Sequence, residues 1–562
     1  MWARNLLFLA VCGIGAAWTA STLMQPASRF VHFSEAPSGR KPARSEGQPA
    51  ARRHRDDAWQ QALAQLDAQF YKAWADAGLT YAPRADDLMI ARRLSLALVG
   101  TIPSLEEIRA LEAWPEDERL PRWVDHLLAD RRFAEYWSER LARAYVGSEQ
   151  GNIVLFRRRR FRLWLADALA KNMPYDELVR HLLADEGVWT GQPAVNFITA
   201  TINPAGGNEP DPVRLAGRTA RAFLGMRIDC LQCHDDKLGT IELGTADDPQ
   251  GGAQAHFHEL AAFFASAQIS LVGVRDGQRP YLVKYQGDAQ ERKVAPQVPF
   301  GKEFFEGHGT RRVQLAQWVT HPQNRPFARA TVNRVWALLF GRPLVEPVDD
   351  IPLHGPWPVG LEFLADEFVR SGYDLARLIR LIAASAPMLR DSRADFPITP
   401  EHEAAWAVFP LSRLRPEQMA AALVQASWLK TIDGQAHVLQ RLAMAGQIDQ
   451  FVRRYGDLGD DEFNDQASTI PQRLLLMNGE LVKERTRPQP LVTATSRLAM
   501  LSRDPQRQVE AAYLAVLTRR PTPTEWAHFV TRLHDVSPRQ RGQALEDLYW
   551  TLVNSTEFSW NH

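Results

Sequence analysis

The chain has 562 residues, of which 45% are hydrophobic and 23% are charged, the ordinary composition of globular domains. This length is enough for roughly two to four domains, each with its own core. Lysine plus arginine and aspartate plus glutamate number 66 each, so the chain lacks the overall basic charge typical of nucleic-acid-binding proteins. We therefore expect no nucleic-acid partner.

The N-terminus has the pattern of a membrane helix. Residues 6–24 carry no charged side chain, and this length is sufficient to cross a hydrocarbon core about 30 Å thick. Arg4 precedes the segment, and the positive-inside rule then favours export of the rest of the chain. We predict a signal-anchor or transmembrane helix over 1–24, with cleavage after Ser21 as the alternative. Either way, we expect the protein on the periplasmic or another extracytoplasmic face, membrane-anchored or secreted.

Two regions follow the predicted anchor. Residues 25–56 are rich in Pro, Gly, Ser and Arg without apolar periodicity, which predicts a flexible linker and an ordered body that begins near Asp57. Residues 57–267 repeat apolar side chains at spacings of three and four, as helices do. Ser104 and Glu107 are predicted to form a capping box at the start of one of these helices.

The pattern changes at residues 268–300. Short β-branched and aromatic runs alternate there with turn-forming residues, which predicts a small antiparallel β insertion. Helical periodicity resumes over 301–562. The predicted fold class is therefore mainly α, a multi-helical body in two parts, 57–267 and 301–562, with the β insertion between them.

The sequence CLQCH places Cys230 and Cys233 directly before His234. Cys-x-x-Cys-His is the attachment signature of c-type haem, in which two thiols bind the porphyrin covalently and the histidine ligates the iron. The chain has only three cysteines, and the remaining one, Cys12, lies in the predicted membrane helix. The preceding sequence, DPVRLAGRTARAFLGMRIDC, predicts a helix that leads directly into the motif. The sequence therefore predicts covalent haem c at these three residues.

Three alternatives remain open for the motif. A divalent metal such as zinc would need remote ligands, for which His256 and His258 are candidates. A redox-active dithiol usually lies at the start of a helix in a βαβ setting, which this region does not resemble. A structural disulfide across so small a ring stabilises little. The distal haem ligand also stays open; the candidates are His256, His258, His308, His354 and Met388.

Several long stretches carry a family resemblance. In the first half these are ARRLSLALVGTIPSLEEI, WVDHLLADRRFAEYWSERLARAY, KNMPYDELVRHLLAD and FLGMRIDCLQCHDDKLG. In the second half they are LAQWVTHPQNRPFARATVNRVWALLFGRPLVEPVDDI, QRLLLMNGELV, LTRRPTPTEW and LVNSTEFSWNH. The chain resembles a planctomycete-type tandem of domains of unknown function, a cytochrome-like PSCyt domain followed by a PSD domain. The resemblance implies an exported cytochrome-like protein, without a settled activity.

The chain departs from the family pattern directly after the motif. The resemblance leads us to expect Cys-x-x-Cys-His-Asp-His, and this chain keeps Asp235 but has Asp236 in place of the second histidine. If that histidine serves a metal or the chemistry, this member has lost it. If it only supports the motif, haem attachment is retained.

Arginines stand out at two places in the sequence. Arg157, Arg158, Arg159, Arg160 and Arg162 form a basic run, which predicts a solvated helix face or a patch that binds anions such as haem propionates, a sulfated polysaccharide or an acidic partner. Arg334 follows Asn333 in an otherwise apolar stretch, and we expect it to pair with Asp349 or Asp350 as a structural clamp. The alternative is a carbohydrate site lined by Arg334, Trp336 and Asp350, which the spacing does not support.

The leading interpretation is an exported, membrane-anchored protein that carries covalent haem for electron transfer or for redox support of a protein partner. The alternative is a non-redox extracytoplasmic scaffold, or a protein that acts on anionic polysaccharide, in which Cys-x-x-Cys-His is a metal site or a relic. The sequence contains no Gly-rich phosphate loop, no Ser-His-Asp order and no His-x-x-x-His pair, and we assign no enzymatic activity.

Overall fold

The computed structural model describes residues 49–148, 155–203, 209–245, 247–285 and 288–432, and, further on, 446, 448, 450–456, 463, 470–479, 482, 494–537 and 540–562. The predicted membrane helix at 1–24 and residues 25–48 of the predicted linker lie outside these residues. The first helix among the described residues begins at Pro49, before the expected start of order at Asp57. Within the described residues, no helix is both long and apolar enough to cross a membrane.

The first part of the body is helical, as predicted. Asp86 and Ser104 cap two of its helices, and the predicted capping box between Ser104 and Glu107 is confirmed. The described helices, in chain order, are α2 (Pro49–Asp76), α3 (Asp87–Val99), α4 (Leu105–Ala113), α5 (Glu116–Ala129), α6 (Arg131–Val146), α7 (Arg158–Ala170), α8 (Tyr175–Ala184), α9 (Asn196–Thr199), α10 (Pro212–Thr219) and α11 (Gln254–Ala261), with short helical turns η1 (Pro193–Val195), η2 (Ala220–Leu224), η3 (Asp229–Gln232) and η4 (Phe264–Ser266).

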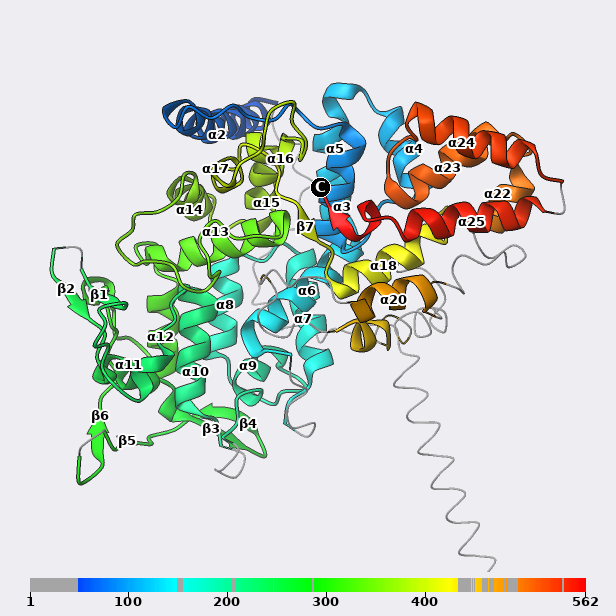
Figure 1. The fold of residues 1–562 in the computed structure, drawn as a ribbon. Helices are drawn as coiled ribbons and strands as arrows, with labels where there is room; N and C mark the ends of the chain where they lie inside the picture. Colours follow the sequence, from blue (N-terminus) through cyan, green and yellow to red (C-terminus); the bar gives the residue numbers. More distant parts are fainter. Residues whose placement is uncertain are drawn as a thin grey trace, which may run out of the picture. The chain divides into compact units, whose positions relative to one another are not determined.

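The predicted β insertion is confirmed as two antiparallel hairpins. Ala267 pairs with Asp276 in the first and Tyr281 with Val294 in the second. Figure 1 shows both hairpins at the rim of the helical body. The strands are β3 (Ala267–Ser270) with β4 (Gly273–Asp276) and β5 (Tyr281–Val283) with β6 (Arg292–Val294); a further small sheet, β1 (Glu242–Gly244) with β2 (Pro249–Gly251), was not predicted.

The second part of the body is again helical. Its described helices and short turns are η5 (Lys302–Phe304), α12 (Arg311–Val319), α13 (Arg325–Phe340), α14 (Leu361–Arg370), α15 (Leu375–Ala384), α16 (Ala386–Leu389), α17 (Pro400–Ala404), α18 (Pro416–Ala426), α20 (Ile470–Asn478), α22 (Ala494–Leu501), α23 (Pro505–Leu517), α24 (Pro523–His534), α25 (Arg541–Val553) and η6 (Glu557–Ser559). The fold is mainly helical with small antiparallel sheets, so the predicted fold class is confirmed.

The C-terminus returns to the middle of the body. Strand β8 (Trp560–Asn561) pairs with β7 (Ser412–Arg413), and Ser412 lies opposite Asn561 in the antiparallel register. Figure 1 shows the C-terminus beside α3. Such a pairing joins residues nearly 150 positions apart in the chain, so local sequence patterns give no sign of it.

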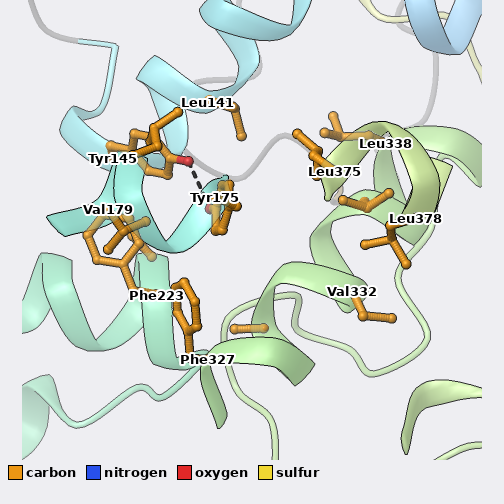
Figure 2. Close-up of a cluster of buried hydrophobic side chains, with 14 of the residues drawn as sticks. Leu141, Tyr145, Tyr175, Val179, Phe223, Phe327, Val332, Leu338, Leu375 and Leu378 are labelled. Atoms are coloured by element: carbon orange, nitrogen blue, oxygen red, sulfur yellow. Dashed lines mark hydrogen bonds between the residues drawn. The ribbon is translucent and has the colours of Figure 1, made fainter. Parts of the chain in front are cut away.

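Helix α13 is the central element of the larger core. All of its residues from Pro326 to Phe340 are buried, which is the pattern of a helix surrounded by other elements. Around it, the core draws side chains from both sides of the β insertion. Figure 2 shows part of this core, where Tyr145 and Tyr175 share a hydrogen bond of 2.8 Å between their hydroxyls, near Phe223 and Phe327.

Candidate functional site

The cysteine motif lies on a short helical turn at the surface. Cys230 is in η3 and Cys233 directly follows it; both side chains are exposed and both thiols are free. His234 is exposed as well. The motif therefore presents two thiols and an imidazole to solvent from a single turn of backbone.

The prediction that a helix leads directly into the motif is wrong. The helical segment α10–η2 ends at Gly225, whose left-handed backbone (φ +62°) terminates it five residues before Cys230. The Gly225 carbonyl accepts a hydrogen bond of 2.7 Å from the backbone N–H of Ile351, so the termination is fixed by tertiary contact. Residues 226–228, which belong to neither a helix nor a strand, then connect to the turn.

His234 has one engaged ring nitrogen. Its Nδ1 lies 2.9 Å from the backbone oxygen of Asp235, and because a carbonyl only accepts, Nδ1–H is the donor. The proton of the neutral ring then resides on Nδ1, and Nε2 keeps its lone pair. Metal-ligating histidines commonly have this arrangement, in which a carbonyl fixes the tautomer and the other nitrogen binds the metal.

Two aspartates hold the backbone of the motif in place. The Asp235 carboxylate accepts a hydrogen bond of 2.8 Å from Gln254 N–H at the start of α11. Asp236 accepts hydrogen bonds from the backbone N–H groups of Ile241 (2.6 Å) and Leu238 (3.0 Å). These backbone bonds, with Ile241 first, hold the pKa of the Asp236 carboxyl below its ordinary value. Asp236 therefore shapes the loop that follows the motif.

His258 and His256 lie on α11 beside the motif but differ in their contacts. His258 is buried; its Nε2 donates to the Gln232 carbonyl at 3.1 Å and its Nδ1 accepts from the Tyr281 hydroxyl at 2.9 Å. Both ring nitrogens are therefore engaged, and His258 supports the backbone between the two cysteines. His256 is half-buried, and its Nδ1 accepts from the backbone N–H of Ala253 at 3.1 Å.

These side chains fit the attachment chemistry of haem c. That chemistry requires two accessible thiols separated by two residues and a neighbouring imidazole with an available nitrogen. Cys230, Cys233 and His234 meet each requirement, because all three are exposed and Nε2 of His234 has no hydrogen-bond partner among the described residues.

Comparison with family models identifies one domain in each half of the chain. Residues 65–268 match PSCyt2, a protein of unknown function (DUF1549), and residues 311–455 match PSD1, a protein of unknown function (DUF1553). The chain carries a PSCyt2 domain followed by a PSD1 domain. A search of curated proteins found no match, and neither did a search of solved structures.

The arginine run of the PSCyt2 domain lies at the start of α7. Arg158 and Arg162 both form ion pairs with Glu139, at 3.0 and 3.2 Å. Burial raises the pKa of Glu139, and the two arginines more than offset this, so the pKa lies below its ordinary value. Arg157, Arg159 and Arg160 are exposed. The run thus divides into an internal ion-pair cluster and an exposed basic surface.

A group of potential metal ligands in the same domain already has a cation. Glu107, His126 and Asp130 place one ligand atom each within 4.8 Å of one another. However, Arg132 pairs with both Glu107 and Asp130, and the contact with Asp130 measures 2.8 Å. The guanidinium supplies the positive charge that a metal ion would supply.

The predicted clamp between Arg334 and Asp349 or Asp350 is wrong. Asp349 pairs with Arg227 of the PSCyt2 domain at 2.8 Å, and no carboxylate of the described chain lies within 4.0 Å of Arg334. The neighbouring Asn333 does act as a clamp: its amide donates to the Val345 carbonyl (2.9 Å) and accepts from the Val345 N–H (3.0 Å). Arg334 does line a cavity, but Trp336 and Asp350, the other residues of the alternative carbohydrate site, are not part of its described lining.

Proposed function

We propose that this protein is an exported, membrane-tethered carrier of covalent haem, with Cys230 and Cys233 as the attachment residues and His234 as the axial ligand. The observation that carries the proposal is the state of His234. Its Nδ1–H is held by the Asp235 carbonyl at 2.9 Å, which leaves Nε2 available beside two free, exposed thiols.

The surrounding residues would hold these three groups in position. Asp235 ties the motif to the start of α11, and His258 fixes the Gln232 carbonyl between the cysteines. Haem bound here would supply one-electron transfer. Because the three attachment side chains are exposed, a redox partner could approach this surface directly. The proposed role is electron transfer or redox support of an extracytoplasmic protein partner.

The predicted N-terminal helix supports export, which is also required for haem attachment through thiols. Residues 6–24 are uncharged and long enough to span a membrane. We therefore place the PSCyt2 and PSD1 domains, as part of this proposal, on the extracytoplasmic side of the membrane. An anionic polysaccharide remains a proposed ligand of the exposed arginines at the start of α7.

The test is covalent haem on the full-length chain. The chain is expressed in a host with haem-attachment machinery, separated on a denaturing gel and stained for haem. We expect a haem band that migrates with the protein, loss of the band in the Cys230→Ser/Cys233→Ser variant, and its retention in Cys12→Ser, the matched control. His234→Ala should retain attachment and alter the visible spectrum.

The opposite outcome would establish the alternative. If the wild-type chain stays free of haem under conditions that mature a control cytochrome, the haem proposal is wrong. Elemental analysis then separates the remaining cases: about one equivalent of zinc would mean a metal site, and its absence would mean a non-redox extracytoplasmic protein in which the motif is a relic.

A further inference from the structure

A large cavity lies where the two family domains meet. It has a volume of about 760 Å³ and is lined by α6 and α10 of the PSCyt2 domain and by α13 and the β7 region of the PSD1 domain. Ligand pockets in proteins typically measure about 300–1,000 Å³ and occur preferentially at such junctions. The cavity is therefore large enough for a small organic ligand.

The described lining of this cavity is strongly basic. It includes nine arginines against four carboxylates. The arginines are Arg143, Arg214, Arg218, Arg221, Arg227, Arg334, Arg342, Arg413 and Arg415, and the carboxylates are Asp229, Glu346, Asp349 and Glu403. This excess of positive charge within a low-dielectric wall creates a potential that attracts anions.

Two of the four carboxylates already form ion pairs with arginines that line the cavity. Asp229 pairs with Arg221 at 2.6 Å, and Asp349 pairs with Arg227 at 2.8 Å. Glu346 is largely exposed and lies 3.6 Å from Arg342, which also donates to a backbone carbonyl. Arg143 pairs with Glu139, which lies outside the lining, at 3.2 Å. Within the described lining itself, arginines still outnumber carboxylates.

Arg334 and Arg415 are the two cavity residues that need a counter-charge most. They are only 8% and 6% exposed, and no carboxylate of the described residues lies within 4.0 Å of either. The Nε of each has no hydrogen-bond partner in the described structure. Among the described residues, the Arg415 guanidinium donates only to the neutral Tyr136 hydroxyl, at 3.2 Å. Burial of a guanidinium without an anion is costly, so such residues usually have a partner.

Other buried arginines of the same body have a carboxylate or several backbone carbonyls as partners, even where one guanidinium nitrogen, such as an Nη of Arg312, has none. Arg312 is completely buried and pairs with Asp276 at 2.5 Å. Arg93 donates to three backbone carbonyls at distances between 2.6 and 3.1 Å. Arg334 has neither kind of partner in the described part of the chain. Its unsatisfied guanidinium therefore has the character of a binding group rather than a structural one.

We propose that this cavity binds a small ligand with more than one oxyanion group (carboxylate, sulfate or phosphate), and that Arg334 and Arg415 supply the counter-charges. Arginine suits this task because its planar donors match oxyanions in pairs. The N-terminus of α18, directly after Arg415, adds a positive dipole end at the same wall. The proposal is independent of haem attachment.

The test uses the full-length chain with two probes that differ in the source of the oxyanion: sucrose octasulfate, a sulfated disaccharide, and inositol hexakisphosphate, a phosphorylated ring. Binding is measured by titration calorimetry and by the thermal unfolding midpoint, with sodium chloride at matched ionic strength as the control for screening. The variants are Arg334→Met and Arg415→Met, with Arg131→Gln, an exposed arginine outside the cavity, as the matched control.

We expect at least one probe to raise the unfolding midpoint beyond the effect of chloride. Each methionine variant should weaken binding about tenfold or more, because a charge-assisted contact is lost, whereas Arg131→Gln should leave binding unchanged. Tighter binding of one probe identifies the source of the ligand. Arg334→Met should keep or raise the midpoint of the ligand-free protein, because it removes an uncompensated buried charge.

Three results would overturn the proposal. The first is that neither probe raises the unfolding midpoint more than chloride does. The second is that the methionine variants bind the probe as tightly as the wild-type chain. The third is that Arg334→Met lowers the midpoint of the ligand-free protein, which would indicate a structural role. The same titration in the Cys230→Ser/Cys233→Ser background separates this proposal from the haem proposal. Equal binding there is expected, and lost binding would attribute the signal to the motif.

Discussion

The contacts of His258 permit a quantitative prediction about the support of the cysteine motif. Its imidazole joins the Gln232 carbonyl to the Tyr281 hydroxyl, and both His258 and Tyr281 are buried. The perturbation is His258→Ala. The loss of the partner of the Tyr281 hydroxyl should lower the free energy of unfolding by about 1–3 kcal/mol. The cavity left by the ring should lower it by roughly 1 kcal/mol more.

The expected loss is therefore about 3 kcal/mol. Unfolding entropy is about 2.1 cal/mol/K per residue, which for the unit of residues 59–562 amounts to roughly 1 kcal/mol/K. The thermal midpoint should then fall by about 3 °C, measured by calorimetry. Tyr281→Phe removes only the hydroxyl and should cost about 1 kcal/mol. The double variant should lose less than the sum of the two, by about 1–2 kcal/mol, because the two groups contact each other.

The same residue should make stability depend on pH. Burial, partly offset by the bond to Gln232, holds the pKa of His258 below its ordinary value of 6.5. Below pH 6.5 the unfolded chain binds a proton at this residue that the folded protein does not, so the free energy of unfolding should fall as the pH falls. His258→Gln should remove this part of the pH dependence.

Two results would refute this account of His258. An unchanged midpoint in His258→Ala would mean that the hydrogen bonds contribute nothing measurable. A loss of bound haem or metal in His258→Ala, together with full retention of stability, would assign His258 to the ligand set. Tyr281→Phe is the matched control for the second result, because it perturbs the same contact without removing a potential ligand.

The remaining predictions concern acid stability and the position of the motif. Burial raises the pKa of Glu107, but His126 and Arg132 lower it more, to about 2. The ionised carboxylate should therefore stabilise the folded protein by roughly 3 kcal/mol above pH 4.5, and this contribution should be lost as the pH falls towards 2. Glu107→Gln should therefore lower the midpoint at pH 7 and flatten the acid unfolding curve, and an unchanged curve would contradict the assignment. Gly225→Ala should destabilise the protein more than Gly78→Ala. Both glycines have φ near +60°, so the backbone strain of an alanine is similar. Only at Gly225, however, would the new Cβ meet side-chain atoms, at 3.0–3.1 Å, whereas Gly78 faces open space. Thermal midpoints compare the two, and equal losses would show that packing around Gly225 is not tight.

Local features of this protein could be predicted from the sequence because they depend on neighbouring residues. The helical periodicity, the capping box at Ser104 and the hairpins within 268–300 all depend on residues a few positions apart. The spacing of Cys230, Cys233 and His234 is likewise a property of consecutive residues. The comparison with PSCyt2 and PSD1 confirmed the resemblance over residues 65–268 and 311–455.

Only the tertiary structure decided which distant groups meet. The pairing of Ser412 with Asn561 and the contact of His258 with Gln232 and Tyr281 depend on long-range folding. The position of Arg334 also depends on long-range folding. The sequence predicted Asp349 as one candidate partner of Arg334, whereas in the structure Asp349 pairs with Arg227. A charged residue in an apolar stretch can be recognised from the sequence. Whether its counter-charge belongs to the protein or to a ligand depends on which side chains the fold brings within reach.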